Sequence, residues 1–183
     1  MQQTGEYRIG APRDAVWTAL NDPDVLARCI EGCQSMVRTA DDAFAASVKA
    51  KVGPVNATFQ ADLTLTDIKP PDSYTLNANV KGGAAGFGKG VARVSLMPEG
   101  AATLLRYEVE GQVGGKLAQV GQRLIDAATR KMADDFFAKF GDDVAPGVSE
   151  KIVTEPAATE KSGRYVIWVI VFLVLIMAIV LAS

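Results

Sequence analysis

Histidine is absent from this chain of 183 residues. The commonest general base, the usual Ser–His–Asp triad and most protein zinc sites depend on that side chain. Cysteine is nearly absent too, because only Cys29 and Cys33 are present and no further thiol or imidazole can complete a metal site around them. The sequence therefore predicts no metal ligands and no catalytic residues, and we expect a protein that is not an enzyme.

A strong charge of one sign is also missing, because 19 Lys and Arg residues nearly balance 21 Asp and Glu residues and leave a net charge of −2. Nucleic-acid-binding proteins normally carry a clear basic surplus, so we expect no nucleic-acid partner. Cys29 and Cys33 are four residues apart and would share one face of a helix. We expect them to stay reduced in the cytoplasm. They are either small side chains near a helix end, which we favour, or a redox pair.

The chain does contain one long apolar run, from Tyr165 to Ala182, without a charged residue. As a helix it would be about 27 Å long at ~1.5 Å per residue, close to the ~30 Å hydrocarbon core of a bilayer. A buried core helix would carry a polar stripe, and a signal peptide would lie at the other end. Lys161 and Arg164 precede the run, which places the N-terminal domain in the cytoplasm. We expect a single-pass anchor in the cytoplasmic (inner) membrane.

These observations divide the chain into three parts. Residues 1–144 are long enough to form one domain with its own hydrophobic core. Residues 145–163 are rich in Pro, Glu, Lys, Thr and Ala without periodicity, which is typical of a flexible linker. Residues 164–183 form the predicted transmembrane anchor.

Within the first part, a strand and two short helices precede a series of strands. The strand is predicted over residues 4–10, and the helices are predicted to end at Leu20 and to span about 23–29. From Gln34 to Val113 apolar and polar residues alternate, as in strands with one buried face. Four groups of turn residues interrupt the alternation: Gly53-Pro54, Pro70-Pro71-Asp72, Gly82-Gly83 and Pro98-Glu99-Gly100. This pattern predicts an antiparallel meander of about six strands.

A long amphipathic helix is predicted next, from Gly114-Gly115 to Gly141. Apolar positions recur along it at intervals of three and four: Leu117, Val120, Gly121, Leu124, Ala128, Met132 and Phe136. The expected fold class is α+β: a curved antiparallel sheet of about six to seven strands around a long C-terminal helix, plus one C-terminal transmembrane helix. One helix is narrower than the sheet it covers, so the space between them is either a hydrophobic cavity or a filled core. Small inward residues such as Ala46 and Ala50 favour the cavity.

The same patterns predict which residues line such a cavity: Phe44, Val48, Phe59, Leu63, Leu76, Phe87, Gly121, Leu124, Ile125, Ala128 and Met132. For any one of them, an ordinary core position is favoured over a specific ligand contact. Gly121 in mid-helix destabilises a helix by ~1 kcal/mol relative to Ala, so we expect a ligand or a strand to approach it closely. The glycine-rich segment 82–90 is either a flexible gate with Phe87 as its lid or an ordinary hairpin loop.

Several segments resemble one known family. They are residues 21–33 (NDPDVLARCIEGC), residues 111–125 (GQVGGKLAQVGQRLI), residues 130–137 (RKMADDFF), residues 51–55 (KVGPV) and Tyr74. With the order of helices and strands, they resemble the carbon monoxide dehydrogenase CoxG family of the START-like (SRPBCC) superfamily of helix-grip proteins. The resemblance covers residues 1 to about 140. Glu31 stands where that family usually has Pro, which affects only the local turn.

The resemblance implies a non-catalytic accessory protein. Such a protein would recruit a molybdenum-containing carbon monoxide dehydrogenase to the membrane. The predicted anchor, the small inward residues and the absence of catalytic groups add the hypothesis that it binds and delivers a respiratory quinone, menaquinone or ubiquinone, in the helix-grip cavity. One alternative is a general lipid-binding or lipid-transfer module without an enzyme partner. Another is an enzyme with inward acid–base groups, for which Asp62, Glu108 and Glu110 are unsuitable because they lie on the polar side of their strands.

Overall fold

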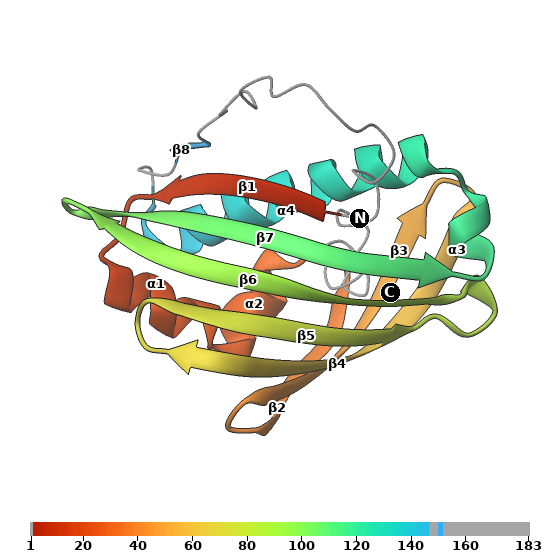
Figure 1. Ribbon diagram of the computed structural model, residues 1–183, viewed down its shortest axis with the longest axis horizontal. Coiled ribbons are helices and arrows are strands. Elements are labelled where there is room, and N and C mark those ends of the chain that lie inside the picture. The colour runs from red at the N-terminus through yellow and green to blue at the C-terminus, as the bar shows by residue number, and fades with distance from the viewer. Residues whose placement is uncertain (1, 147–149, 152–183) are drawn as a thin grey trace.

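Figure 1 shows the computed structural model, which describes residues 2–146 and 150–151. The predicted span 165–182 and most of the predicted linker 145–163 lie outside the described residues. Within the part of the chain that is described, no helix has both the length and the apolar character needed to cross a bilayer.

One antiparallel sheet contains all the described strands, in the order β2-β3-β4-β5-β6-β7-β1-β8. The strands are β1 (Gln2–Ile9), β2 (Cys33–Ala40), β3 (Ala43–Val52), β4 (Val55–Lys69), β5 (Ser73–Lys81), β6 (Phe87–Glu99), β7 (Ala102–Gly114) and the short β8 (Glu150–Lys151). The helices are α1 (Arg13–Leu20), α2 (Pro23–Cys29), the 3₁₀ turn η1 (Gly83–Ala85), α3 (Lys116–Gln119) and α4 (Gln122–Val144). This confirms the predicted antiparallel sheet with a long C-terminal helix.

The alternating pattern places the buried side chains as expected. Every second residue of β3 is buried, and so is every second residue of β4 from Phe59 to Leu65. The predicted breakers fall at turns, so β3 and β4 are joined at Gly53-Pro54 and β6 and β7 at Gly100. One feature was not expected: β8, within the segment predicted to be linker, pairs with β1 through Tyr7 and Arg8.

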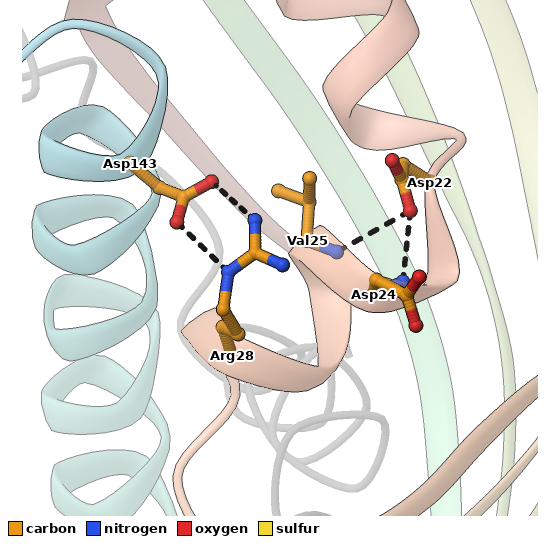
Figure 2. Close-up of polar contacts among 5 residues, drawn as sticks. All are labelled: Asp22, Asp24, Val25, Arg28 and Asp143. Carbon is orange, nitrogen blue, oxygen red and sulfur yellow. Dashed lines mark hydrogen bonds and ion pairs between the residues drawn. The ribbon is translucent and has the colours of Figure 1, made fainter.

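The short helix α2 begins where its sequence predicts. Asp22 is its N-cap, and its carboxylate accepts hydrogen bonds from the backbone N–H groups of Asp24 at 2.8 Å and Val25 at 3.4 Å (Figure 2). Pro23 occupies the first helical position, where a missing N–H removes no helical bond. Local capping therefore fixes this helix independently of its packing.

The prediction of one uninterrupted helix from Gly115 to Gly141 is wrong. Helix α3 ends at Gln119, and α4 begins at Gln122. Gly121 lies between them with φ of +91°, a conformation that side chains with a Cβ rarely adopt. Gly121 is therefore a helix N-cap rather than a mid-helix residue, and no atom of the described residues lies within 4 Å of the position its Cβ would occupy. The expected close approach is not observed.

The sheet curves around α4, which contacts β1, β3 and α2 (Figure 1). The buried face of α4 includes Ile125, Met132, Phe136 and Phe140. Helices α1 and α2 pack beside the C-terminal half of α4 and complete one hydrophobic core. The interior between α4 and the sheet is the place where a ligand-binding site was expected.

Candidate ligand-binding site

Three neighbouring strands supply the sheet side of this interior. Phe44 and Val48 of β3 are directly opposite Leu63 and Phe59 of β4, and all four are at most 5% exposed. Leu76 of β5 is half-buried and packs against the same core. The register therefore brings these five predicted residues together on one face of the sheet.

Small side chains separate the large ones on this face. Ala46, Ala50, Ala61, Ala78 and Ala92 are each at most 6% exposed, and they come from β3, β4, β5 and β6. Ala46 lies opposite Ala61 across the β3–β4 ladder. A face of this kind is apolar and has little bulk, as the sequence predicts.

Helix α4 turns most of its predicted residues toward the core, with Leu124 as the exception. Ile125 and Met132 are buried, Ala128 is half-buried, and Leu124 is 53% exposed. Residues that are eleven apart on a helix differ by about 20° in direction, whereas residues twelve apart differ by about 120°. Ile125 therefore shares the direction of the buried Phe136, and Leu124 does not.

Phe87 also lies outside the interior. The buried residues of β6 are the even-numbered ones, such as Ala92 and Leu96, so Phe87 points to the outer face and is 45% exposed. Its ring covers Gly114, the residue opposite it on β7, where an added Cβ would collide with the ring. Phe87 therefore does not cover the interior as the predicted lid would.

Glycines bring two segments into contact at this end of the molecule. A Cβ on Gly86 would collide with the carbonyl oxygen of Gly114, and a Cβ on Gly115 would lie 2.6 Å from the Cα of Gly86. Both Gly86 and Gly115 have positive φ, of +120° and +74°. The chain before β6 and the chain after β7 therefore touch through their backbones.

We call this end of the domain the tip. It consists of the β3–β4 turn, η1 with the first residues of β6, the end of β7, α3 and the first turn of α4, which lie at the right in Figure 1. The turn meets the helices directly, since a Cβ on Gly53 would lie 3.0 Å from Val120 and 3.7 Å from Leu124. Phe87 and Leu124 are thus both exposed apolar residues of the tip.

Sequence reasoning missed a buried group of aromatic rings on β1, β7 and α4. Tyr7 stacks on Phe137 with ring centroids 4.0 Å apart, and Tyr107 stacks on Phe137 at 5.8 Å. The hydroxyl of Tyr7 donates a 2.7 Å hydrogen bond to Oδ1 of Asp134. Burial, the neighbouring Tyr107 and the Asp134 carboxylate raise the pKa of Tyr7, while burial raises the pKa of Tyr107 to about 12. Both hydroxyls therefore keep their protons at neutral pH.

Gln3 adds a polar group to the same face of β1 as Tyr7. Its side-chain oxygen Oε1 is buried, and no hydrogen-bond donor within the described residues reaches it. Gln3 lies opposite Val109 on β7, four residues from Tyr7 along β1. An unpaired buried amide oxygen is unfavourable unless a ligand or water satisfies it. The alternation of the sequence places Gln3 and Tyr7 on one face of the strand, but it cannot reveal that Oε1 of Gln3 lacks a hydrogen-bond donor.

A hollow lies outside the interior, between α1, α2 and the end of α4. It is an open cleft of about 480 Å³ lined by Asp14, Ala15, Thr18, Ala19, Asp22, Val25, Asp143 and Val144. Arg28 donates two hydrogen bonds to the Asp143 carboxylate, at 3.1 and 2.9 Å, and joins α2 to α4 beside the cleft (Figure 2). These hydrogen bonds lower the pKa of Asp143. Of the acidic side chains here, Asp22 is engaged in capping and Asp143 in pairing.

The two cysteines take the structural role that the sequence favours. Cys29 is the last residue of α2 and Cys33 the first of β2, so they do not share a helix face. Burial raises the pKa of Cys29 to about 11 and that of Cys33 above its ordinary value, which keeps both thiols protonated and unreactive. Among the described residues, no group of three His, Cys, Asp or Glu side chains could hold a metal ion.

Comparison with solved structures defines the class of protein. The chain is similar to a conserved protein from Geobacillus kaustophilus, with 32% identity, a TM-score of 0.74, and coverage of 79% of this chain and 95% of that one. A START superfamily protein from Mycobacterium smegmatis has the same fold at 11% identity, with a TM-score of 0.60 and coverage of 78% and 96%. The domain therefore has the helix-grip fold of START-like proteins.

Comparison with family models gives a more specific assignment than the fold alone. The family model that describes CoxG, a subunit of carbon monoxide dehydrogenase, matches residues 5–145. The chain belongs to the CoxG family, as its sequence motifs indicate. The search of the curated proteins finds no match to this chain.

Proposed function

We propose that this protein is a membrane-anchored accessory protein that binds a respiratory quinone between its sheet and α4. The observation that carries the proposal is the apolar inner face of β3, β4 and β5, where buried alanines alternate with large side chains opposite α4. Each CH₂ moved from water into such a site stabilises binding by ~0.8 kcal/mol. The free energy of a prenyl tail changes little when it moves from the apolar bilayer to an apolar site in the protein, so its exchange between lipid and protein is reversible.

Polar side chains of β1 and β7, in the same sheet as this apolar face, suit a quinone head group. A quinone carries two carbonyl oxygens that accept hydrogen bonds, and a quinol carries two hydroxyls that also donate them. Tyr7 already donates its hydroxyl proton to Asp134, so the protonated hydroxyl of Tyr107 is the donor that could serve the first, and the unpaired Oε1 of Gln3 can accept from the second. Gln3 on β1 and Tyr107 on β7 therefore supply an acceptor and a donor on neighbouring strands of the same sheet.

The family and the C-terminal run support the remaining parts of the proposal. Membership of the CoxG family associates the chain with a carbon monoxide dehydrogenase system, and the apolar run 165–182 supports anchoring in the inner membrane. A soluble molybdenum-containing dehydrogenase cannot reach a quinone inside the bilayer. A tethered carrier would recruit the enzyme to the membrane and deliver the quinone to it.

The test is the organic extraction of the full chain purified in mild detergent, followed by mass spectrometry of the extract. We expect about one quinone per chain. Ala61→Phe fills the inner face, where Ala61 is 2% exposed, and should reduce the bound quinone at least tenfold. The matched control is Ala40→Phe, at an exposed position of β2, which should retain it.

Circular dichroism of both variants establishes that the fold is kept. An extract that holds no quinone contradicts the carrier function. An extract that holds phospholipid in its place assigns the domain to lipid binding or transfer without an enzyme partner. Co-purification of a molybdenum-containing dehydrogenase with the tagged chain tests the partner in the same preparation.

A further inference from the structure

We infer that the tip is a docking surface for anionic lipid headgroups, with Phe87 and Leu124 as its apolar contacts. The inference rests on the proposed function, since a carrier must meet the bilayer to exchange its ligand. It concerns a separate property, namely which end of the domain faces the membrane.

Exposed large apolar side chains are few among the described residues. Two of the four, Phe87 at 45% and Leu124 at 53%, belong to the tip, one at the start of β6 and one in the first turn of α4. The close contacts of Gly86 with Gly114 and Gly115 hold the segment that carries Phe87 in place. Phe87 and Leu124 are therefore presented to the surroundings by a rigid support.

Cations surround these two residues. Lys51 precedes the β3–β4 turn, Lys89 follows Phe87 on the same face of β6, Lys116 begins α3, and Arg123 precedes Leu124, and all four are exposed. None of them forms an ion pair within the described part of the chain.

Carboxylates are scarce at the tip. The first turn of α4 contains no acidic residue. The nearest acidic residues of the flanking strands, Asp62 and Glu110, lie within β4 and β7 and pair with Lys81 at 3.4 Å and Arg93 at 3.8 Å.

The other ends of the strands have the opposite character. Acidic residues lie at the turns after β2, β4 and β6 and at the end of α4: Asp41, Asp42, Asp72, Glu99, Asp142 and Asp143. Arginines pair with three of these acids, Asp72, Glu99 and Asp143, whereas the four cations of the tip have no ion-pair partner among the described residues. Such a distribution orients the domain at the negatively charged cytoplasmic leaflet, where each nearby Lys or Arg strengthens binding about fivefold.

The length of the tether allows this orientation. The described chain ends at Lys151, which pairs with Tyr7 on β1, and Tyr7 pairs in turn with Leu105 on β7. From Leu105 to Gly114 the strand covers about 30 Å at ~3.3 Å per residue. Residues 152–164 can extend to roughly 43–47 Å before the predicted span begins. The tip can therefore reach the bilayer surface while the anchor stays inserted.

The experiment uses the full chain reconstituted in vesicles, with an environment-sensitive fluorophore on a single added cysteine. Ala84→Cys places the fluorophore on η1 at the tip, and Ala101→Cys places it at the exposed turn between β6 and β7. The parent chain, with its two native thiols, is the labelling control. Vesicles contain either phosphatidylcholine alone or phosphatidylcholine with 30% phosphatidylglycerol (about one lipid in three), and doxyl-labelled lipids act as quenchers.

We expect phosphatidylglycerol to shift the emission at position 84 to shorter wavelength and to increase its quenching at least twofold, with no change at position 101. The double variant Lys89→Glu, Lys116→Glu should remove this response. The control variant Lys69→Glu, Lys139→Glu changes the net charge equally, at exposed residues away from the tip, and should retain it. Added salt should weaken the response of the parent chain.

Equal responses at positions 84 and 101, or none at either, overturn the inference. So does a response that survives charge reversal at the tip, or one that appears only when the dehydrogenase is added, which would make the tip a protein interface. Measuring the quinone extracted from the same samples distinguishes a failure of the docking surface from a failure of the carrier function. Bound quinone without a lipid response refutes the docking surface alone, whereas a lipid response without bound quinone refutes the carrier function alone.

Discussion

The hydrogen bond from Tyr7 to Asp134 should contribute measurably to the stability of the domain. Tyr7→Phe removes only the hydroxyl, because the ring that stacks on Phe137 at 4.0 Å is kept. Hydrogen bonds to charged groups contribute ~1.5–3 kcal/mol, and the half-buried position of Asp134 favours the lower value. We expect the free energy of unfolding at pH 7 to fall by about 1.5 kcal/mol and Tm by roughly 3–6 °C for a domain of this size.

The pH dependence gives this prediction its sharper form. The folded state raises the pKa of Tyr7, so Tyr7 keeps its proton above pH 10, where an unfolded tyrosine loses it. The stabilisation of the protonated form is complete below the unfolded pKa of ~10 and is lost as the pH rises, by up to ~1.4 kcal/mol per pH unit. Tyr7→Phe removes one such group. The stability gap between the parent and the variant should therefore shrink by about 1 kcal/mol between pH 9.5 and 11.

Urea unfolding of the full chain in mild detergent, followed by circular dichroism from pH 7 to 11, measures both effects. Tyr74→Phe is the matched control, because burial alone raises the pKa of Tyr74 and its hydroxyl has no hydrogen-bond partner among the described residues. Tyr74→Phe should change the free energy of unfolding little at pH 7. It should still reduce the loss of stability between pH 9.5 and 11, because it also removes a tyrosine with a raised pKa. A gap for Tyr7→Phe that stays constant from pH 9.5 to 11 would refute the argument.

Two further predictions test the direction of α4 and the backbone contact at the tip. Ile125→Ala should lower the free energy of unfolding by about 2–4 kcal/mol because Ile125 is 3% exposed, whereas Leu124→Ala should change it by less than about 0.5 kcal/mol; equal losses in urea would contradict the observed helix phase. Gly86→Ala should be severely destabilising, because its Cβ would meet backbone, whereas Gly83→Ala should lower stability by only about 1 kcal/mol, since it has positive φ but open space. Thermal melts compare the two, and similar Tm values would argue against the contact.

The strands and short helices could be predicted from the sequence because their signals are local. Alternation identifies the inward residues of β3 and β4, and the Asp22-Pro23 pair marks the start of α2. Turn residues separate consecutive strands, so antiparallel neighbours follow from the short connections. Neither inference requires knowledge of distant contacts.

The break at Gly121 and the outward directions of Leu124 and Phe87 could not be predicted in this way. Gly121 interrupts the helix, and apolar residues spaced by four drift around it, so the stripe that includes Leu124 turns away from the core. In β6 the inward positions near the tip are Gly88 and Gly90, which carry no apolar side chain, so the outward Phe87 gives a misleading signal. The Tyr7–Asp134 contact joins residues 127 apart, and no periodicity reports such a distance.

The position of β1 in the sheet also determines when the domain can fold during synthesis. β1 is made first, yet its hydrogen-bonded neighbour is β7, and Gln2 pairs with Glu110, 108 positions later. At roughly 5–20 residues per second, ribosomes need about 5–20 s to make that stretch. Throughout this time Tyr7 and Ile9 lack the strand that later buries them. The newly made N-terminus is therefore a site where chaperones could act, and release of a chain that ends before β7 leaves its first strand unpaired.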